Sequence, residues 1–471
     1  MLEQTNFHRG QTGLAEGDKA PSQDSAHGHS LSHFLRLLFR LLDEHQIRYC
    51  VLHSWEGLPD QLPGDLDIAV HPGDRGRLPL VFRVVQDEGY RPVQCLNYFA
   101  HAFYFVFFWF EGGVLSSAAV DIIFEHRRSG LVSLSGQELV TGREKVRDFW
   151  FASPATEFTY LLAKRTWKGY ADSRQVRRLG HLVEQLGTPR AEELAGKIFL
   201  GKLKARVVDA CANGSIDELL REIGTQPWCT SLARHPLGLV RFVCGEALRV
   251  TRRWFHPTGL FVVILGPDGV GKSTLVGRLS QEFGPCFRRH RIFHWRPMVI
   301  AAQKETGAVV SDPHGVLPRG TLRSVAVLLG FFLDYWVGYC LVLRPFLARS
   351  GLVMFDRYFH DLLVDPLRYR YGGPMWLARL LGRFVPPPDL MFLVLDAEDQ
   401  VIFTRKREVP PEELRRQRAG YQQFITDERR AALITTDKGV EPTLKAATRL
   451  VVEYLAERFE RQNVCWLARA D

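Results

Sequence analysis

Cysteines are scarce in this chain, and they lack the spacing that a metal site or a disulfide framework would need. Only 8 occur among 471 residues, and no two form C-x-x-C or group with histidine at zinc-ligand spacing. A chain of this length does not need disulfides to hold its core. We therefore predict free thiols in a reducing environment, as is typical of a cytoplasmic protein.

Several catalytic and targeting patterns are also absent. The histidines form no H-E-x-x-H pattern, and there is no Gly-x-Ser-x-Gly elbow. Residues 1–28 contain no apolar stretch like that of a signal peptide, and their content of Gly, Ser and His predicts a disordered tail. These absences argue against a zinc protease, a serine hydrolase and a secreted protein.

The positive charge of the chain is modest and widely spread. Lys and Arg number 61 against 52 Asp and Glu, which gives a formal net charge of +9. This excess favours anionic ligands such as nucleotides over a dedicated nucleic-acid-binding arm. A hydrophobic content of 46% suffices for more than one core. The length alone predicts roughly three domains.

The order of local patterns predicts three structured regions after the tail. Residues 29–150 mix helical and strand patterns, which indicates an α+β domain, and residues 151–250 are mostly helical. Residues 258–471 alternate strand and helix patterns, which predicts an α/β domain with a parallel sheet. The expected strands are 48–54, 65–70, 91–96, 100–110, 120–126, 260–265, 351–356 and 389–396, and the first expected helices are 31–46 and 76–90.

One apolar segment, from Val325 to Leu343, has the length of a membrane span. Asp334 lies at its centre, where a carboxylate would be costly in lipid. We therefore expect a buried core helix and no membrane span.

The most specific motif begins at Gly266 and reads G-P-D-G-V-G-K-S-T. It follows the apolar run LFVVIL and precedes a helical pattern, which is the context of a Walker A loop. Glycines let backbone N–H groups approach phosphate oxygens, and the helix N-terminus adds positive charge. Lys272 would neutralise the phosphates of ATP, and the Ser273 hydroxyl would ligate Mg²⁺. The expected cofactor-binding residues are Gly266, Asp268, Gly269, Val270, Gly271, Lys272, Ser273 and Thr274.

A carboxylate for the same metal ion is expected at Asp356. The apolar run GLVMFD would deliver it to the carboxyl edge of the sheet, where ligands of open α/β sheets bind. A solvated aspartate at the start of a loop is the alternative, which the neighbouring Walker A loop disfavours.

Together with Asp356-Arg357-Tyr358, the loop GPDGVGKST resembles the thymidylate kinase family of P-loop nucleoside-monophosphate kinases, over residues 258–471. The resemblance implies catalytic roles for Lys272, Asp356, Arg357, Arg405 and Arg407, and binding of the acceptor phosphate by Arg296 and Arg357. Arginines and Mg²⁺ suit phosphoryl transfer, which depends mainly on positioning and charge neutralisation. For Arg405 and Arg407, a solvated surface charge stays an equal alternative.

The sequence departs from that family where the base of the acceptor is read. The family usually has an arginine after the acidic or amide residue of its middle helix, whereas this chain has Asp334-Tyr335. The serine common soon after Asp-Arg-Tyr is replaced by Phe359-His360-Asp361. We hypothesise an ATP-dependent kinase whose acceptor need not be dTMP.

Two carboxylates nearer the N-terminus, Asp65 and Asp67, lie on one side of an expected strand because strand side chains alternate. Asp121 opens a further strand pattern, and Ser54 ends an earlier one. This set resembles the nucleotidyltransferase fold, although His53 stands where glycine is usual. The resemblance implies a Mg²⁺ site at Asp65, Asp67 and Asp121, with a solvated strand edge or a degenerate scaffolding domain as alternatives.

The sequence thus predicts an ATP- and Mg²⁺-dependent phosphotransferase fused to a nucleotidyltransferase-like domain and a helical segment. Its partners would be a nucleotide and a small phosphate-bearing or hydroxyl acceptor, with no strong sign of nucleic acid, and a homodimer is compatible with the sequence. Two alternatives stay open. One is an ATP-binding regulatory or assembly protein without turnover, and the other is nucleotidyl transfer to a sugar or protein by the N-terminal domain.

Overall fold

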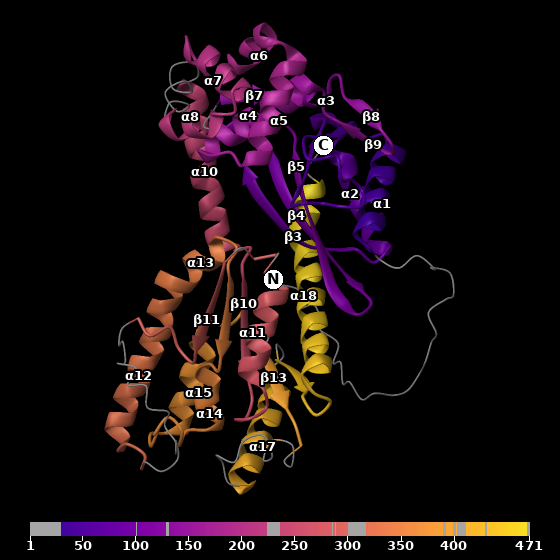
Figure 1. Ribbon diagram of the computed structural model, residues 1–471. Helices are drawn as coiled ribbons and strands as arrows, with labels where there is room; N and C mark the ends of the chain where they lie inside the picture. The colour runs from indigo at the N-terminus through magenta and orange to yellow at the C-terminus, as the bar shows by residue number, and fades with distance from the viewer. Residues whose placement is uncertain are drawn as a thin grey trace, which may run out of the picture. The chain divides into compact units, whose positions relative to one another are not determined.

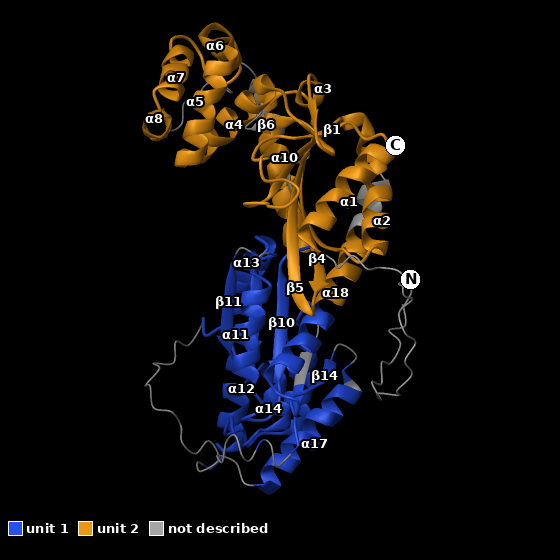
Figure 2. Cartoon of the chain, turned by 45° about the vertical axis from the view of Figure 1, so that its right-hand side comes forward, with its two compact units in different colours: residues 1–28, 256–451 blue, residues 29–255, 452–471 orange. Residues whose placement is uncertain are grey.

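The chain folds into two compact units, described by a computed structural model (Figure 2). Unit 1 comprises residues 1–28 and 256–451, and unit 2 comprises residues 29–255 and 452–471. The described residues are 30–99, 101–128, 131–223, 236–284, 286–287, 289–299, 317–389, 392–398, 402, 411–428 and 431–468. The predicted tail, Arg405 and Arg407 lie outside them.

Unit 2 is built on a seven-stranded sheet in the order β3-β4-β5-β2-β1-β9-β8. Its strands are β1 (Tyr49–Val51), β2 (Leu66–Val70), β3 (Arg91–Phe99), β4 (Ala102–Glu111), β5 (Val114–Ile123), β8 (Glu144–Val146) and β9 (Phe149–Phe151). Strand β2 pairs in parallel with β5, and β1 with β9, whereas the other neighbours are antiparallel. A separate two-stranded sheet joins β6 (His126–Arg128) and β7 (Leu131–Leu134).

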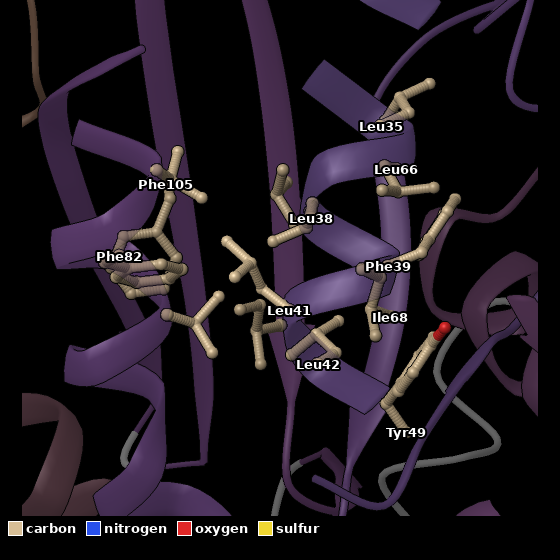
Figure 3. Packing of buried hydrophobic residues seen from close by; sticks show 14 of the residues in the cluster. Leu35, Leu38, Phe39, Leu41, Leu42, Tyr49, Leu66, Ile68, Phe82 and Phe105 are labelled. Atoms are coloured by element: carbon tan, nitrogen blue, oxygen red, sulfur yellow. The ribbon is translucent and has the colours of Figure 1, made fainter. Parts of the chain in front are cut away.

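Helix α1 (Leu31–Glu44) supplies much of the apolar core of this sheet, because one face of the helix is lined with leucine and phenylalanine. Ser30 caps its N-terminus by accepting a hydrogen bond from the backbone N–H of His33. Figure 3 shows Leu38 and Leu41 gathered with Ile68 of β2 and Phe82 of α2 (Leu78–Asp87). The two helices predicted first are therefore confirmed, with shorter bounds.

The segment predicted to be helical forms its own apolar cluster within unit 2. It contains α4 (Pro154–Lys168), α5 (Ser173–Leu186), α6 (Thr188–Ala195), α7 (Leu203–Ala212), α8 (Ile216–Ile223) and α10 (Pro236–Phe255), and the short α3 (Gly136–Val140) precedes it. Helix α4 begins with Ser153 as its cap and Pro154 in its first turn, and it ends at Gly169 in a left-handed conformation.

Unit 1 contains the predicted parallel sheet, with five strands in the order β11-β12-β10-β13-β14 (Figure 1). The strands are β10 (Leu260–Leu265), β11 (His290–His294), β12 (Leu352–Asp356), β13 (Phe392–Asp396) and β14 (Ala431–Thr435). Every residue of β10 and β12 is buried, as expected when helices cover both faces. The helices include α11 (Lys272–Glu282), α12 (Thr321–Gly338), α13 (Arg344–Ala348), α14 (Phe359–Val364), α15 (Met375–Phe384), α17 (Pro411–Asp427) and the first part of α18 (Val440–Ala468).

The apolar segment around Asp334 is helical, but most of it is not buried. Helix α12, a π-helical segment and α13 together form one helix over Thr321–Ala348. Only 22% of the most apolar window of this helix is buried. The prediction of a buried core helix is therefore wrong for most of this surface. One stripe, including Leu328 and Tyr335, packs in the core, whereas Leu322 on another face is 88% exposed. One such helix does not by itself argue for a membrane span.

Candidate functional site

The glycine-rich loop of unit 1 turns the chain from β10, which ends at Leu265, into α11, which begins at Lys272 (Figure 1). Gly266 has φ +141°, and a Cβ there would lie 2.5 Å from the carbonyl oxygen of Leu395, so the turn requires glycine. Gly271 precedes the helix with φ +97°. The loop therefore presents the first amide groups of α11 without a Cβ in front of them, as phosphate binding requires.

Lys272 is buried behind this loop. Its ammonium group donates to the carbonyl oxygens of Gly266 at 2.8 Å and Pro267 at 2.6 Å. Burial, together with the nearby charge of Arg357, lowers the pKa of Lys272 to about 8. An anion at the loop would favour the charged form, because phosphate oxygens are stronger partners for an ammonium group than carbonyl oxygens are.

Strand β12 brings Asp356 to the hydroxyl of Ser273. The Ser273 Oγ donates to Asp356 Oδ2 at 2.8 Å, whereas Asp356 Oδ1 is buried without a hydrogen-bond partner. Burial opposes the ionisation of Asp356, but His294, Lys272 and Ser273 outweigh it and lower the pKa of this carboxyl to about 2. The Asp356 carboxylate is therefore ionised at neutral pH and has one oxygen available.

This pair fits a Mg²⁺ ion, which prefers oxygen ligands and usually takes only one or two from protein carboxylates. Within the described part of the chain, no three His, Cys, Asp or Glu side chains form a metal-binding group. Ser273 and Asp356 would therefore hold the ion together with phosphate oxygens and water.

Two arginines meet at Asp268 in the same loop. Arg357 and Arg368 both donate hydrogen bonds to the Asp268 carboxylate. Arg357 also donates to Asp361 Oδ2 at 2.8 Å, and two tyrosine hydroxyls donate to Asp361. Although burial disfavours its charge, the neighbouring carboxylates raise the pKa of Arg357 well above its usual value. Arg357 is thus a fixed cation beside the loop.

These groups surround a pocket of about 340 Å³. Its lining consists of Asp268, Gly269, Gly271, Lys272, Ser273, Thr274, His294, Asp356, Arg357 and Arg368. Gly266 and Val270, which the motif also includes, do not line it: Gly266 shapes the turn, and Val270 is buried beside it. The folded chain therefore gathers most of the predicted cofactor residues and Arg357 around one hollow.

Three residues of this site escaped the sequence analysis. Asp361 lies four residues after Arg357, a helical spacing that could have identified the ion pair. His294 is the register partner of Asp356 in the neighbouring strand β11, but the motif does not include it. No local pattern marks Arg368, which is 100 residues from Asp268.

Arg296, predicted to bind the acceptor phosphate, does not line the pocket. It is buried, and its guanidinium lies 3.5 Å from Asp334 of α12. Asp334 also accepts hydrogen bonds from the backbone N–H groups of Met298 and Val299, at 3.0 and 2.7 Å. In this structure Arg296 and Asp334 therefore fix the segment after β11, and the acceptor-binding role of Arg296 stays a prediction.

A glycine loop entering a helix, a buried lysine, and a strand-end aspartate beside a serine define a P-loop unit of mixed α/β fold. No protein-family model matches the chain. The chain is 27% identical over 140 residues to the thymidylate kinase of Xanthomonas euvesicatoria pv. vesicatoria (strain 85-10). This match covers 29% of this chain and 57% of that protein. The chain thus spans little more than half the length of this relative.

Two solved thymidylate kinases are also similar to the chain. The structure from Ehrlichia chaffeensis has a TM-score of 0.29 and 17% identity, and it covers 41% of this chain and 98% of its own. The structure from Candida albicans has a TM-score of 0.31 and 14% identity, with coverages of 42% and 93%. The sequence match to the Xanthomonas protein covers 29% of this chain, so the similarity to a thymidylate kinase applies to part of its length.

Two of the three aspartates predicted as a metal site in unit 2 lie opposite one another on neighbouring strands. The parallel pairing of β2 and β5 puts Asp67 in register with Asp121. Asp65 comes just before β2 and accepts a hydrogen bond from the hydroxyl of Tyr104 at 3.1 Å. Within the described residues the three aspartates do not form a metal-binding group in this arrangement, and Mg²⁺ binding and the nucleotidyltransferase resemblance stay predictions.

Protein groups surround the Asp67 carboxylate. Lys164 of α4 donates to both oxygens at 2.7 Å, and Tyr160 donates to Oδ1 at 3.0 Å. His53 Nε2 lies 2.7 Å from Oδ2, and its Nδ1 lies 2.8 Å from Ser54 Oγ. Burial disfavours the charge, but Lys164 and His53 hold the pKa of Asp67 well below its usual range. The present arrangement therefore leaves no oxygen of Asp67 for a metal ion.

Proposed function

We propose that unit 1 is an ATP- and Mg²⁺-dependent phosphotransferase whose acceptor carries a phosphate group. One observation carries this proposal: a single pocket combines Lys272, Ser273 and Asp356 with two arginines, Arg357 and Arg368. A protein that binds ATP only as a regulatory switch would need Lys272, Ser273 and Asp356, but it would not need the two arginines. Arg357 and Arg368, which pair with Asp268 in this structure, could instead bind a second anionic group such as the phosphate of an acceptor.

Each residue has a defined task in this proposal. Lys272 and the amide groups of the loop would hold the phosphates of ATP, while Ser273 and Asp356 would hold Mg²⁺. When bound, the metal ion would neutralise charge that develops on the phosphate oxygens. Arg357, braced by Asp361, would hold the acceptor phosphate in line with the transferring group.

Similarity to thymidylate kinases makes dTMP one candidate acceptor, but the middle helix supports a different one. Asp334 is fully buried and engaged with Arg296 and two backbone amides. The hydroxyl of the adjacent Tyr335 donates to the carbonyl oxygen of Trp295. Neither polar group is available to a base in this arrangement, so we propose a phosphate-bearing acceptor other than dTMP.

The test is turnover of labelled ATP with a panel of phosphate-bearing acceptors that includes dTMP, with both phosphoryl and adenylyl products measured. Lys272→Ala should lower phosphoryl transfer by about 100-fold or more, since a preorganised charge at the transferring group is lost. Lys438→Ala, which changes an exposed lysine of unit 1, is the matched control and should keep wild-type turnover.

The outcomes separate the candidate functions. Unchanged phosphoryl transfer in Lys272→Ala would refute the proposed site. Tight ATP binding without turnover of any acceptor would favour a regulatory or assembly role. Adenylyl products that survive Lys272→Ala would place catalysis in unit 2, and efficient, selective phosphorylation of dTMP would refute the altered acceptor.

A further inference from the structure

The Asp67 carboxylate in unit 2 has no remaining capacity to accept bonds. A carboxylate offers about four acceptor positions on its two oxygens. Here they meet two contacts from the Lys164 ammonium group at 2.7 Å, the Tyr160 hydroxyl at 3.0 Å and His53 Nε2 at 2.7 Å. A metal ion could bind Asp67 only by displacing one of these groups.

Lys164 occupies the place that a metal ion would need. Its nitrogen is equidistant from the two Asp67 oxygens, which is the position of a cation bound by both of them. Asp67 is only 4% exposed, so its charge requires a counter-charge from the protein or from an ion. The ammonium group supplies that counter-charge, and a divalent ion at the same position would be repelled by it.

The neighbouring aspartates increase the need for this ammonium group. Asp121 is in register with Asp67 on the next strand, and Asp65 lies two residues before Asp67. Negative charge on these neighbouring residues disfavours the charge of Asp67 unless a cation offsets it. Helix α4 brings Lys164 to this place from 97 residues further along the chain.

We infer that Lys164 is the resident cation of this site, so that the aspartates of unit 2 bind no divalent metal ion while its ammonium group is in place. Chemistry that depends on two metal ions is then not available to unit 2. This inference does not depend on the function proposed for unit 1, because it concerns which groups neutralise Asp67.

The test counts Mn²⁺ ions bound to the full-length protein, with free Mn²⁺ measured by electron paramagnetic resonance and no nucleotide added. Wild type and Asp67→Asn should bind equal numbers of ions. Lys164→Met removes the charge but keeps the length of the side chain, and it should gain one site. The double variant Lys164→Met/Asp67→Asn should lose that site again.

Two controls separate this effect from general disturbance of α4. Lys164→Arg keeps a cation and should gain no site, and Lys168→Met changes an exposed lysine of the same helix and should also gain none. Loss of a Mn²⁺ site in Asp67→Asn would overturn the inference, as would a folded Lys164→Met that binds no additional ion. If Lys164→Met does not fold, the comparison of wild type with Asp67→Asn still decides.

Discussion

Asp356 in unit 1 and Asp67 in unit 2 are both buried aspartates on strands, but their surroundings differ. Asp356 accepts a hydrogen bond from Ser273 and keeps one oxygen without a partner. Asp67 is surrounded by an ammonium group, a tyrosine hydroxyl and a histidine nitrogen. The comparison shows that two aspartates that both occur in carboxylate motifs can differ in how many of their oxygens the folded protein already occupies.

The largest effect should come from removing the Asp67 carboxylate, whose two oxygens are both occupied by protein groups. Asp67→Ala leaves the partly buried Lys164 and His53 without their carboxylate, so the free energy of unfolding should fall by about 3–5 kcal/mol. Urea denaturation followed by circular dichroism measures this change. Asp60→Ala, at an exposed aspartate of the same unit, should lower it by no more than about 1 kcal/mol. Equal stability of the two variants would mean that the Asp67 contacts contribute little.

A substitution at Asp356, which keeps one oxygen without a hydrogen-bond partner, should affect activity more than stability. Asp356→Ala removes the proposed metal ligand, so phosphoryl transfer should fall by about 100-fold or more. Its free energy of unfolding should fall by less than that of Asp67→Ala, because the carboxylate accepts one hydrogen bond from Ser273 and its other stabilising partners, His294 and Lys272, act mainly through charge. Turnover and denaturation of the same sample measure both quantities, with Glu441→Ala as an exposed control in unit 1. If Asp356→Ala were strongly destabilised but kept its turnover, the proposed contrast between Asp356 and Asp67 would be wrong.

A smaller effect should appear in the pH dependence of ATP binding. The pKa of Lys272 is about 8 in the ligand-free protein, and bound phosphate should raise it. Binding then takes up a proton near pH 8, and affinity should fall as pH rises above 8, by up to about tenfold per unit. Calorimetry between pH 7 and 9, in buffers of different ionisation enthalpy, measures both. Constant affinity over this range would show that the Lys272 charge is not required.

The smallest effect should come from removing a solvent-exposed ion pair on the surface of the protein. Arg206 and Glu222 of unit 2 lie 2.6 Å apart, but both side chains are more than half exposed. Arg206→Ala should therefore lower the free energy of unfolding by only about 0–1 kcal/mol. The same denaturation experiment would show whether burial accounts for the difference from Asp67, and a loss as large as that of Asp67→Ala would exclude this explanation.

The sequence predicted the strands that helices cover on both sides, because burial demands long apolar runs. Strands β10 and β12 are of this kind. Strand β11, with the sequence HRIFH, lies at the edge of the sheet and is mostly exposed, so no apolar run identifies it. The same limit explains why the prediction that α12 is buried was wrong. The apolar content of a helix does not show how much of its surface packs against other elements.

The glycine loop and Asp356 were predictable because local spacing and strand placement define them. The partners that decide the character of each site were not. Lys164 reaches Asp67 across 97 residues, and Arg368 reaches Asp268 across 100. Only the folded arrangement of helices and strands brings such residues together, so a motif locates a carboxylate without showing its counter-charge.

Helix α18 has a consequence for how the protein is made. Its last residues, from 452 onward, belong to unit 2, where Phe459 joins the apolar cluster of α1 and the sheet. All of the chain from residue 256 to 451, which belongs to unit 1, is synthesised between the two parts of unit 2. Unit 2 therefore cannot complete its core until the residues of α18 from 452 onward have been synthesised. For the same reason, no single cut in the gene would yield both units intact.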